Sequence, residues 1–257
     1  MISSTSNVQI KQITALLKKS KERKEQKAFV IEGRKMFEEI CQDSSRVIKA
    51  YFSDSYVKEQ YANKAMPQVP YEIVADSVFD AMAETVTPQG VLAIVKMPEY
   101  SLENMIADAG TLVLLENLRD PGNLGTIIRT AEAAGAHGII IPKRRSAGLT
   151  STVYKTSAGA VNWLKVARVS NLVETINDLK KKNIWVYGAE ADGQPFHKAD
   201  LSGAVALVIG SEGFGLGRLV RESCDMILSI DMYGKVNSLN ASVSGGILMY
   251  EVVRHRR

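Results

Sequence analysis

The sequence contains few of the residues on which several common classes of site depend. It has two cysteines, Cys41 and Cys224, and three histidines, and none of them shows the close spacing of zinc ligands. Two cysteines so far apart cannot form the disulfide framework of a small secreted protein, so we expect reduced thiols and a cytoplasmic location. The sequence therefore predicts no metal centre.

Long apolar runs and nucleotide fingerprints are absent as well. No stretch approaches the roughly 20 apolar residues that cross a bilayer, and the first residues lack the apolar core of a signal peptide, so we expect no membrane partner. No run fits Gly-x-Gly-x-x-Gly after a first strand, and Gly234-Lys235 is followed by Val236 rather than by the Ser or Thr of a P-loop. These absences argue against an ordinary dehydrogenase or NTPase.

Positive charge is present and unevenly distributed. The net charge of the 257 residues is only +4, but basic residues crowd the start of the chain. Clusters of this kind suit a phosphate backbone, although most charge runs are simply solvated faces. The candidate RNA-binding residues are Lys18, Lys19, Lys21, Arg23, Lys24 and Arg34.

The first 97 residues alternate between helical and strand patterns. An amphipathic helix over 7–20 is followed by expected strands at 28–31, 47–52, 72–74 and 90–95 and by expected helices at 34–42, 56–64 and 77–84. Alternation of this kind predicts a small α/β sandwich domain over residues 1–97. Pro98 then ends the last strand, and a polar stretch predicts a linker over 98–109.

The second domain, residues 110–257, repeats one local design three times. Expected strands at 112–116, 204–209 and 226–230 each lead into a loop rich in Gly, Asn or Ser. Ligands of open parallel sheets bind outside the carboxyl ends of the strands, so three such loops predict one composite site. Further strands are expected at 138–141, 164–167 and 184–187, and helices at 126–134, 151–158 and 172–181, with a basic loop at 143–145.

The last loop carries more small polar groups than a helix start needs. Asn237, Ser238, Asn240, Ser242 and Ser244 surround the expected start of the final helix. One Ser or Asn is enough to cap a helix, and a capped helix alone is the simpler explanation. The surplus favours a ligand at this partly positive helix end.

Three segments together resemble the motifs of the SpoU/TrmH branch of the SPOUT RNA ribose methyltransferases. They are Asn123-Leu-Gly-Thr-Ile-Ile-Arg129 after Asp120-Pro121, Gly210-Ser-Glu-Gly213, and Ser238-Leu-Asn240 after Ile230-x-Met232. The resemblance covers about 111–253, with one departure, Asp231, where the family usually has proline. It implies a carboxy-terminal parallel-sheet domain with a trefoil knot and an S-adenosylmethionine-dependent methyltransferase that acts on a ribose 2′-hydroxyl of RNA.

The resemblance also implies roles for individual residues. Those in catalytic positions are Asn123, Arg129, Glu212, Ser238 and Asn240, and those expected against the cofactor are Gly188, Gly210, Ile230, Met232 and Leu239. Three of these residues also have an ordinary explanation. Arg129 fits a helix-surface residue about one turn inside its helix, and Glu212 fits a carboxylate at a helix start. Asn123 fits a type I turn. A guanidinium stays protonated, so we expect Arg129 to stabilise negative charge rather than to act as a base.

A second resemblance concerns the first domain. Phe29-Val-Ile-Glu-Gly33 and Thr87-Pro-Gln-Gly90 are similar to the ribosomal-protein-like substrate-binding domain of many family members, which favours ribosomal RNA, of the large subunit, over transfer RNA. The resemblance further implies a homodimer through the carboxy-terminal domain. The alternatives are a catalytically silent RNA-binding or ribosome-assembly protein, and a methyltransferase that acts on tRNA or confers antibiotic resistance.

Overall fold

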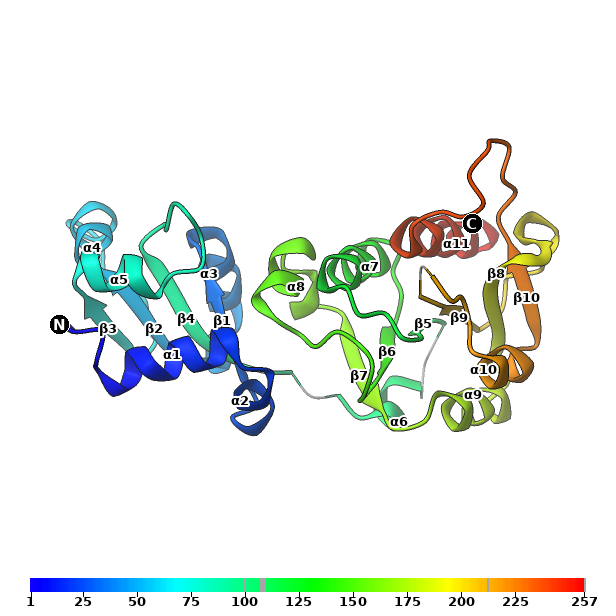
Figure 1. The fold of residues 1–257 in the computed structure, drawn as a ribbon, viewed down its shortest axis with the longest axis horizontal. Helices are drawn as coiled ribbons and strands as arrows, with labels where there is room; N and C mark the ends of the chain where they lie inside the picture. The colour runs from blue at the N-terminus through cyan, green and yellow to red at the C-terminus, as the bar shows by residue number, and fades with distance from the viewer. Residues whose placement is uncertain (99, 107–109, 212, 257) are drawn as a thin grey trace. The chain divides into compact units, whose positions relative to one another are not determined.

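The protein divides into two compact units in the computed structural model, which describes residues 1–98, 100–106, 110–211 and 213–256 (Figure 1). Unit 1 comprises Met1–Met97 with Gly148–Lys155, and unit 2 comprises Pro98–Ala147 with Thr156–Arg257. Residues 148–155, which the sequence analysis placed with the second domain, thus pack in unit 1, where the Tyr154 ring lies 5.2 Å from that of Phe29. No helix in the described part of the chain has the length and apolar character to span a membrane.

Unit 1 is built on a four-stranded sheet in the order β1-β4-β2-β3. The β1–β4 and β4–β2 pairs are antiparallel and the β2–β3 pair is parallel. The strands are β1 (Ala28–Glu32), β2 (Val47–Ser53), β3 (Tyr71–Val74) and β4 (Val91–Lys96). The helices are α1 (Val8–Lys18), α2 (Ser20–Glu25), α3 (Arg34–Ile40), α4 (Asp54–Gln60), α5 (Asp76–Met82) and α8 (Ser151–Thr156), with a 3₁₀ segment at Cys41–Arg46.

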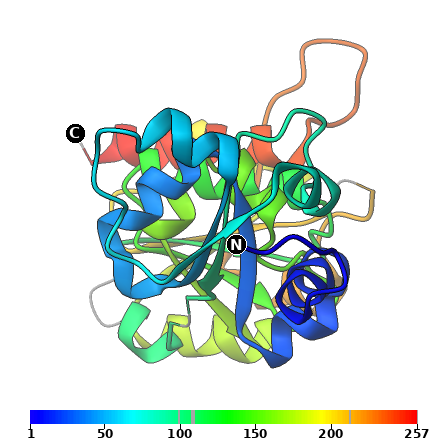
Figure 2. The same cartoon turned by 90° about the vertical axis from the view of Figure 1, so that its left-hand side faces the viewer.

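Helices cover both faces of this sheet (Figure 2). On one face, α1 and α5 bury Ile13, Leu16 and Phe79 against the even-numbered side chains of β1 and β4. On the other face, the Phe37 ring of α3 meets Phe52 of β2 edge-on at 5.3 Å. The α/β sandwich expected from the alternating pattern is therefore confirmed.

Unit 2 contains a six-stranded, all-parallel sheet in the order β10-β8-β9-β5-β6-β7. Its central strands consist mostly of Val, Leu and Ile because parallel strands are buried on both faces. The strands are β5 (Thr111–Leu115), β6 (Gly138–Pro142), β7 (Lys165–Val169), β8 (Trp185–Pro195), β9 (Val205–Ile209) and β10 (Met226–Ser229). The expected parallel α/β class is confirmed, and the trefoil knot stays a prediction.

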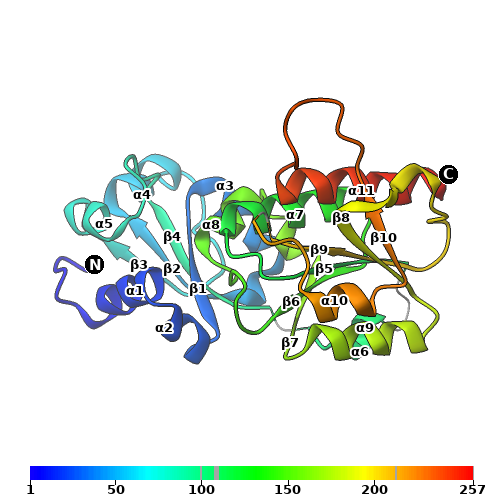
Figure 3. The same cartoon turned by 45° about the vertical axis from the view of Figure 1, so that its right-hand side comes forward.

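Two helical layers enclose the sheet of unit 2 (Figures 1 and 3). One layer consists of α7 (Pro121–Ala133) and α11 (Ala241–His255), which lie side by side. The other consists of α6 (Leu102–Ile106), α9 (Leu172–Lys181) and α10 (Arg218–Ser223). Short 3₁₀ segments at Ala160–Asn162 and Phe196–Lys198 complete the unit. The loop between β10 and α11 projects beyond the helices (Figure 2).

The first helix of the site begins earlier than the sequence pattern predicts. We expected a turn at Pro121–Asn123 and a helix from Thr126, but α7 starts at Pro121. Asp120 caps it by accepting the Gly122 N–H at 2.8 Å, and proline is tolerated at a first helical position because that N–H needs no partner. Arg129 therefore lies about two turns inside the helix rather than one.

Strand β8 is longer than the expected 184–187 strand. It continues to Pro195, and after a register shift Gln194 pairs with Leu228 of β10. Gly193 and Pro195 make this extension resemble a turn in the sequence, but β10 is a short edge strand that can accept an irregular partner. The extension forms one wall of the site described next.

Candidate functional site

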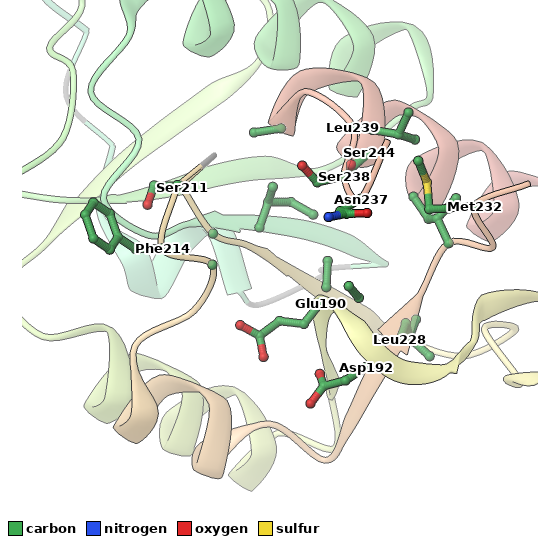
Figure 4. A pocket seen from close by; sticks show the side chains of 18 of the residues that line it. Glu190, Asp192, Ser211, Phe214, Leu228, Met232, Asn237, Ser238, Leu239 and Ser244 are labelled. Carbon is green, nitrogen blue, oxygen red and sulfur yellow. The ribbon is translucent and has the colours of Figure 1, made fainter. Parts of the chain in front are cut away.

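A cavity of unit 2 opens at the carboxyl ends of β8, β9 and β10. It measures about 500 Å³, within the range of small-molecule sites. The predicted loops at 210–217 and 230–240 both line it, as does the extension of β8 (Figure 4). The lining includes Ala189, Glu190, Ala191, Asp192, Ile209, Gly210, Ser211, Gly213, Phe214, Gly215, Arg221, Leu228, Ile230, Met232, Asn237, Ser238, Leu239, Ala241 and Ser244.

Four of the five residues predicted to contact the cofactor line this cavity: Gly210, Ile230, Met232 and Leu239. Gly188 does not. A Cβ at Gly188 would lie 2.7 Å from Leu216 Cδ1 and 2.8 Å from Ile227 Cδ1, so this glycine makes room for packed side chains behind the wall. Its contact with a cofactor stays a prediction that the geometry does not favour.

Gly210 lets the second loop cross itself closely. A Cβ at Gly210 would lie 2.4 Å from the Gly215 backbone, and Ser211 and Gly215 form an isolated antiparallel bridge. Gly215 itself has φ +59°, a conformation that glycine adopts without strain. The two glycines thus let the second loop fold tightly on itself where it lines the cavity, and Gly210 is buried there.

An ion cluster links the β8 extension to the second loop. Glu190 accepts the Leu216 N–H at 2.8 Å and also pairs with Arg221. Arg221 forks onto Asp192 at 2.9 and 3.0 Å, which raises its own pKa and lowers that of Asp192. Glu190, Asp192 and Arg221 therefore fix one wall of the cavity while their charges balance in part.

Asn240 connects the third motif to the first. Its Nδ2 donates to Asn123 Oδ1 at 3.1 Å, and its Oδ1 caps α11 by accepting the Ser242 N–H at 2.8 Å. The helix begins at Ala241, so Ser238 lies in the preceding loop, on the cavity wall. The structure thus brings together the predicted residues Asn123, Asn240 and Ser238.

Arg129 and Glu212 stand apart from this group. Arg129 lies on the exposed face of α7 and lines neither this cavity nor the smaller one beside Asn123, and its side chain has no hydrogen-bond or ion-pair partner among the described residues. Glu212 lies outside the residues that the structure describes. Their predicted catalytic roles stay predictions.

The predicted RNA-binding residues of unit 1 differ in what they already contact. Arg23 donates to the carbonyl oxygens of Leu16 and Leu17, both at 2.7 Å, so its guanidinium caps the end of α1, and burial lowers its pKa. Arg34 pairs with Glu38 at 2.7 Å and Lys21 with Glu25 at 3.7 Å. Of the six predicted residues, Lys18, Lys19 and Lys24 have exposed side chains without such a partner among the described residues.

His137 and His197 do not line the cavity and have partners elsewhere in the unit. His137 Nδ1 accepts the Gly110 and Thr111 N–H groups at 3.2 and 3.3 Å, and His197 lies 3.6 Å from Asp231. The described residues contain no group of three or more His, Cys, Asp or Glu that could hold a metal ion.

Sequence reasoning did not identify several residues of the site. Arg119 and Arg145 line a second cavity beside Asn123, and Phe214 lies on the rim that both cavities share. The basic loop at 143–145 was the only sequence signal for Arg145. The order β9-β5-β6 brings its loop next to the first motif, and that order cannot be derived from periodicity.

Comparisons with known proteins agree with this arrangement. Residues 110–250 match the SpoU rRNA Methylase family, and residues 7–93 match the MRM3-like substrate binding domain. The protein YacO of Bacillus subtilis (strain 168), assigned to the TrmH family of tRNA/rRNA methyltransferases, is 43% identical over 244 residues, which are 90% of this chain and 97% of YacO.

Two solved structures share the whole fold. The SpoU methyltransferase AviRb from Streptomyces viridochromogenes, in complex with the cofactor AdoMet, superposes with a TM-score of 0.83 at 26% identity and covers 97% of this chain and 99% of its own. An RNA 2′-O ribose methyltransferase superposes with a TM-score of 0.79 at 28% identity and covers 99% and 98%. With its two matched domains and its cavity of motif loops, the chain belongs to the SpoU rRNA methylase family.

Proposed function

We propose that the protein transfers the methyl group of S-adenosylmethionine to a ribose 2′-hydroxyl of ribosomal RNA, in the cytoplasm. The observation that carries this proposal is the meeting of the second and third motif loops around one cavity, next to the Asn123–Asn240 bond. AviRb, which shares the fold, was solved with AdoMet, and the other structural relative is named as a 2′-O ribose methyltransferase.

The residues of the larger cavity fit S-adenosylmethionine. Gly210 and Gly215 hold the second loop in a tight fold along the cavity, and Leu228, Ile230 and Leu239 offer apolar contact to an adenine. Ser238, Asn237 and Ser244 offer hydroxyl and amide groups to the polar end of the ligand. Glu190 and Asp192 add carboxylates near a ligand that carries a positive sulfonium.

When bound, the cofactor supplies an electrophilic methyl group, and the acceptor ribose has to lose its hydroxyl proton as the new O–C bond forms. The chain's contribution is to hold the acceptor in line and to stabilise the developing negative charge. Asn123, fixed by Asn240, lies on the side of the smaller cavity and can position the nucleotide. The Arg129 guanidinium serves as a hydrogen-bond donor that stabilises the oxygen or an adjacent phosphate, while a phosphate oxygen or water accepts the proton.

The amino-terminal unit supports ribosomal RNA as the substrate. Residues 7–93 match a substrate-binding domain, and the exposed Lys18, Lys19 and Lys24 supply positive charge on that unit. A separate binding unit suits a large folded RNA, in which the nucleotide to be modified is only one part of the surface contacted.

We also propose a homodimer formed by α7 and α11. On α11, Val243 is 48% exposed and Tyr250 is 50% exposed, and both lie on one face of the helix. Gly246 lets the neighbouring α7 approach, with Thr130 Cγ2 3.5 Å from its ideal Cβ position. A second copy on this face would cover the apolar side chains and bring Arg129, which lines neither cavity of its own chain, toward the partner's site.

A deletion strain tests the proposed reaction. Its ribosomal RNA should lack one ribose methylation, detected as a position newly sensitive to alkaline cleavage, and the purified protein should restore it with labelled S-adenosylmethionine. Transfer of label to tRNA alone would show that the substrate is tRNA rather than ribosomal RNA. Label recovered on a base rather than a ribose, or no transfer to any RNA of the deletion strain, would refute the proposal.

A further inference from the structure

A second cavity adjoins the first at the start of α7. It measures about 420 Å³ and shares Ser211, Gly213 and Phe214 with the larger one. Its remaining lining comes from the loops after β5 and β6, namely Asn117, Leu118, Arg119, Asp120, Asn123 and Arg145. A ligand here would lie beside the proposed cofactor, on the side of Asn123.

The lining of this cavity is positively charged. The side chains of Arg119 and Arg145 are both exposed, and neither has a hydrogen-bond or ion-pair partner in the described chain. Among the lining residues that the structure describes, the acid is Asp120, and it already accepts the Gly122 N–H as the cap of α7. Two unpaired guanidinium groups, with one carboxylate that is already engaged as a helix cap, favour the binding of an anion. The planar guanidinium groups match the geometry of phosphate oxygens.

Two residues of this lining have an unfavourable backbone conformation. Asn117 has φ +55° and Arg145 has φ +59°, a region that costs free energy for any residue with a Cβ, most of all for one that is not Asn or Gly. A bond from the Ala147 N–H to the Leu118 carbonyl oxygen, at 2.8 Å, ties the two loops together. Arg145 thus stands at a position that glycine would occupy more easily, in a loop that the Ala147–Leu118 bond holds beside the first motif.

Phe214 stands on the rim between the two cavities. Its side chain is 94% exposed, and Figure 4 shows it beside Ser211 at the end of the larger cavity away from Met232. A single exposed apolar residue is ordinary. An exposed aromatic ring next to two free arginines, however, offers a flat face for a nucleobase and fixed positive charge for its phosphate.

We infer that the second cavity binds one unpaired nucleotide of the RNA substrate, with its base stacked on Phe214 and its phosphate held by Arg119 and Arg145. The inference rests on the proposed function, because it assigns the acceptor side of that site. Stacking does not depend on base identity, so these residues select a nucleotide that is free of a duplex, and the sequence is recognised elsewhere.

The test uses the full-length protein and a fluorescein-labelled decauridylate, read by anisotropy over a series of salt concentrations. Phe214→Ala should weaken binding about tenfold and leave the salt dependence unchanged, because it removes stacking alone. Arg145→Gly should weaken binding by a similar factor and reduce the slope of log K against log [salt] by about 0.7, because one phosphate contact is lost. Phe214→Trp should retain the affinity.

Matched controls separate this site from a diffuse basic surface. Arg144→Ala removes a neighbouring exposed charge that lines neither cavity, and Tyr233→Ala removes an aromatic side chain that is 95% exposed elsewhere; both should stay within twofold of wild type. Arg145→Gly suits the backbone at φ +59°, so its thermal unfolding midpoint should not fall. Annealing the probe to its complement should abolish the effect of Phe214→Ala.

Two sets of outcomes distinguish the inference from the proposed function. Unchanged affinity in Phe214→Ala, or equal losses in Arg144→Ala and Arg145→Gly, would overturn the inference even if the enzyme methylates RNA normally. The opposite outcome is a protein whose variants show the expected changes in affinity and salt dependence, while the wild type neither binds S-adenosylhomocysteine in a calorimeter nor transfers a methyl group. That outcome would refute the proposed function but support the nucleotide site.

Discussion

Asn240 donates a hydrogen bond to Asn123 at 3.1 Å, across 117 positions of the sequence, and so joins the cap of α11 to the first turn of α7. The same side chain accepts the Ser242 N–H at 2.8 Å and the Ser242 hydroxyl at 2.6 Å. One amide thus performs two tasks, because its oxygen stabilises a helix start while its nitrogen fixes a side chain of the site.

Substitutions at Asn240 should separate these two tasks. Asn240→Ser keeps a capping oxygen but is too short to reach Asn123, so we expect a loss in free energy of unfolding below about 0.5 kcal/mol together with a large loss of methyl transfer. Asn240→Ala should cost about 1 kcal/mol more, because the cap is lost as well. Urea unfolding and methyl transfer to RNA measure the two effects. Full activity in Asn240→Ser would show that the bond to Asn123 has no role in the site.

Gly210→Ala should disrupt the cofactor cavity. The new Cβ would lie 2.4 Å from the Gly215 backbone, so the loop has to shift, and we expect a loss of about 1–3 kcal/mol in stability and at least about tenfold in donor affinity. Gly234→Ala is the matched control, because nothing lies within 4 Å of its Cβ position. Calorimetric titration with S-adenosylhomocysteine compares the two. Equal affinities would mean that the loop can shift to make room for the new Cβ without weakening ligand binding.

The elements of unit 2 were predictable where side-chain chemistry and burial agree. Leu112–Leu115 and Val205–Ile209 are continuous apolar runs, and a strand buried on both faces requires that pattern. The start of α7 was missed because Gly122 and Asn123 are poor helix formers. A cap at Asp120 and the packing of Leu124 and Ile127 outweigh that weakness.

The meeting of the second and third motif loops at one cavity was predictable, because each follows a buried parallel strand, but the lining of the second cavity was not. Ser238, Ile230 and Met232 follow one strand in sequence, so their shared cavity was foreseeable from local order. The approach of Arg145 to Asn123 depends on strands β5 and β6 being neighbours in the sheet. Local patterns do not determine strand order, and for that reason the second cavity emerged only from the structure.

Cys224 should react slowly with alkylating agents. Burial, with a smaller contribution from Asp225, raises the pKa of its thiol to about 12. At pH 8.5, where a free thiol is half ionised, only about one part in a few thousand would be the reactive thiolate. The folded state favours the neutral thiol, so its contribution to stability is complete below about pH 8.5 and is lost as the pH rises toward 12.

Mass spectrometry after a short exposure to iodoacetamide at pH 8.5 checks this. Cys41, whose pKa is raised by burial to a lesser extent, is the internal reference and should label first. Labelling of Cys224 should accelerate when urea unfolds the protein. Rapid modification of Cys224 in the native protein would contradict the raised pKa of its half-buried thiol.

Lysines and Arg23 of the amino-terminal helices should behave differently. Replacing Lys18, Lys19 and Lys24 with serine should lower RNA affinity and reduce the salt slope by about 2–3, because each exposed ammonium is free to contact a phosphate. Arg23→Ala should instead lower stability by about 1–3 kcal/mol, because it leaves the carbonyl oxygens of Leu16 and Leu17 without their donor. Filter binding at several salt concentrations and thermal unfolding distinguish these effects. An unchanged salt slope in the triple variant would show that the RNA binds another surface of the protein.

Arg129 provides the sharpest test of the proposed dimer, because it lies on the exposed face of α7 and lines neither cavity of its own chain. If it serves the partner's site, Arg129→Ala and a cavity variant such as Gly210→Val should each be inactive as pure dimers. Mixed dimers, prepared by unfolding and refolding the two variants together, would contain one site with an intact cavity and an intact arginine. Random pairing then restores about a quarter of wild-type activity. If Arg129 acts within its own chain, no mixed dimer contains a complete site, and the mixture stays as inactive as its components.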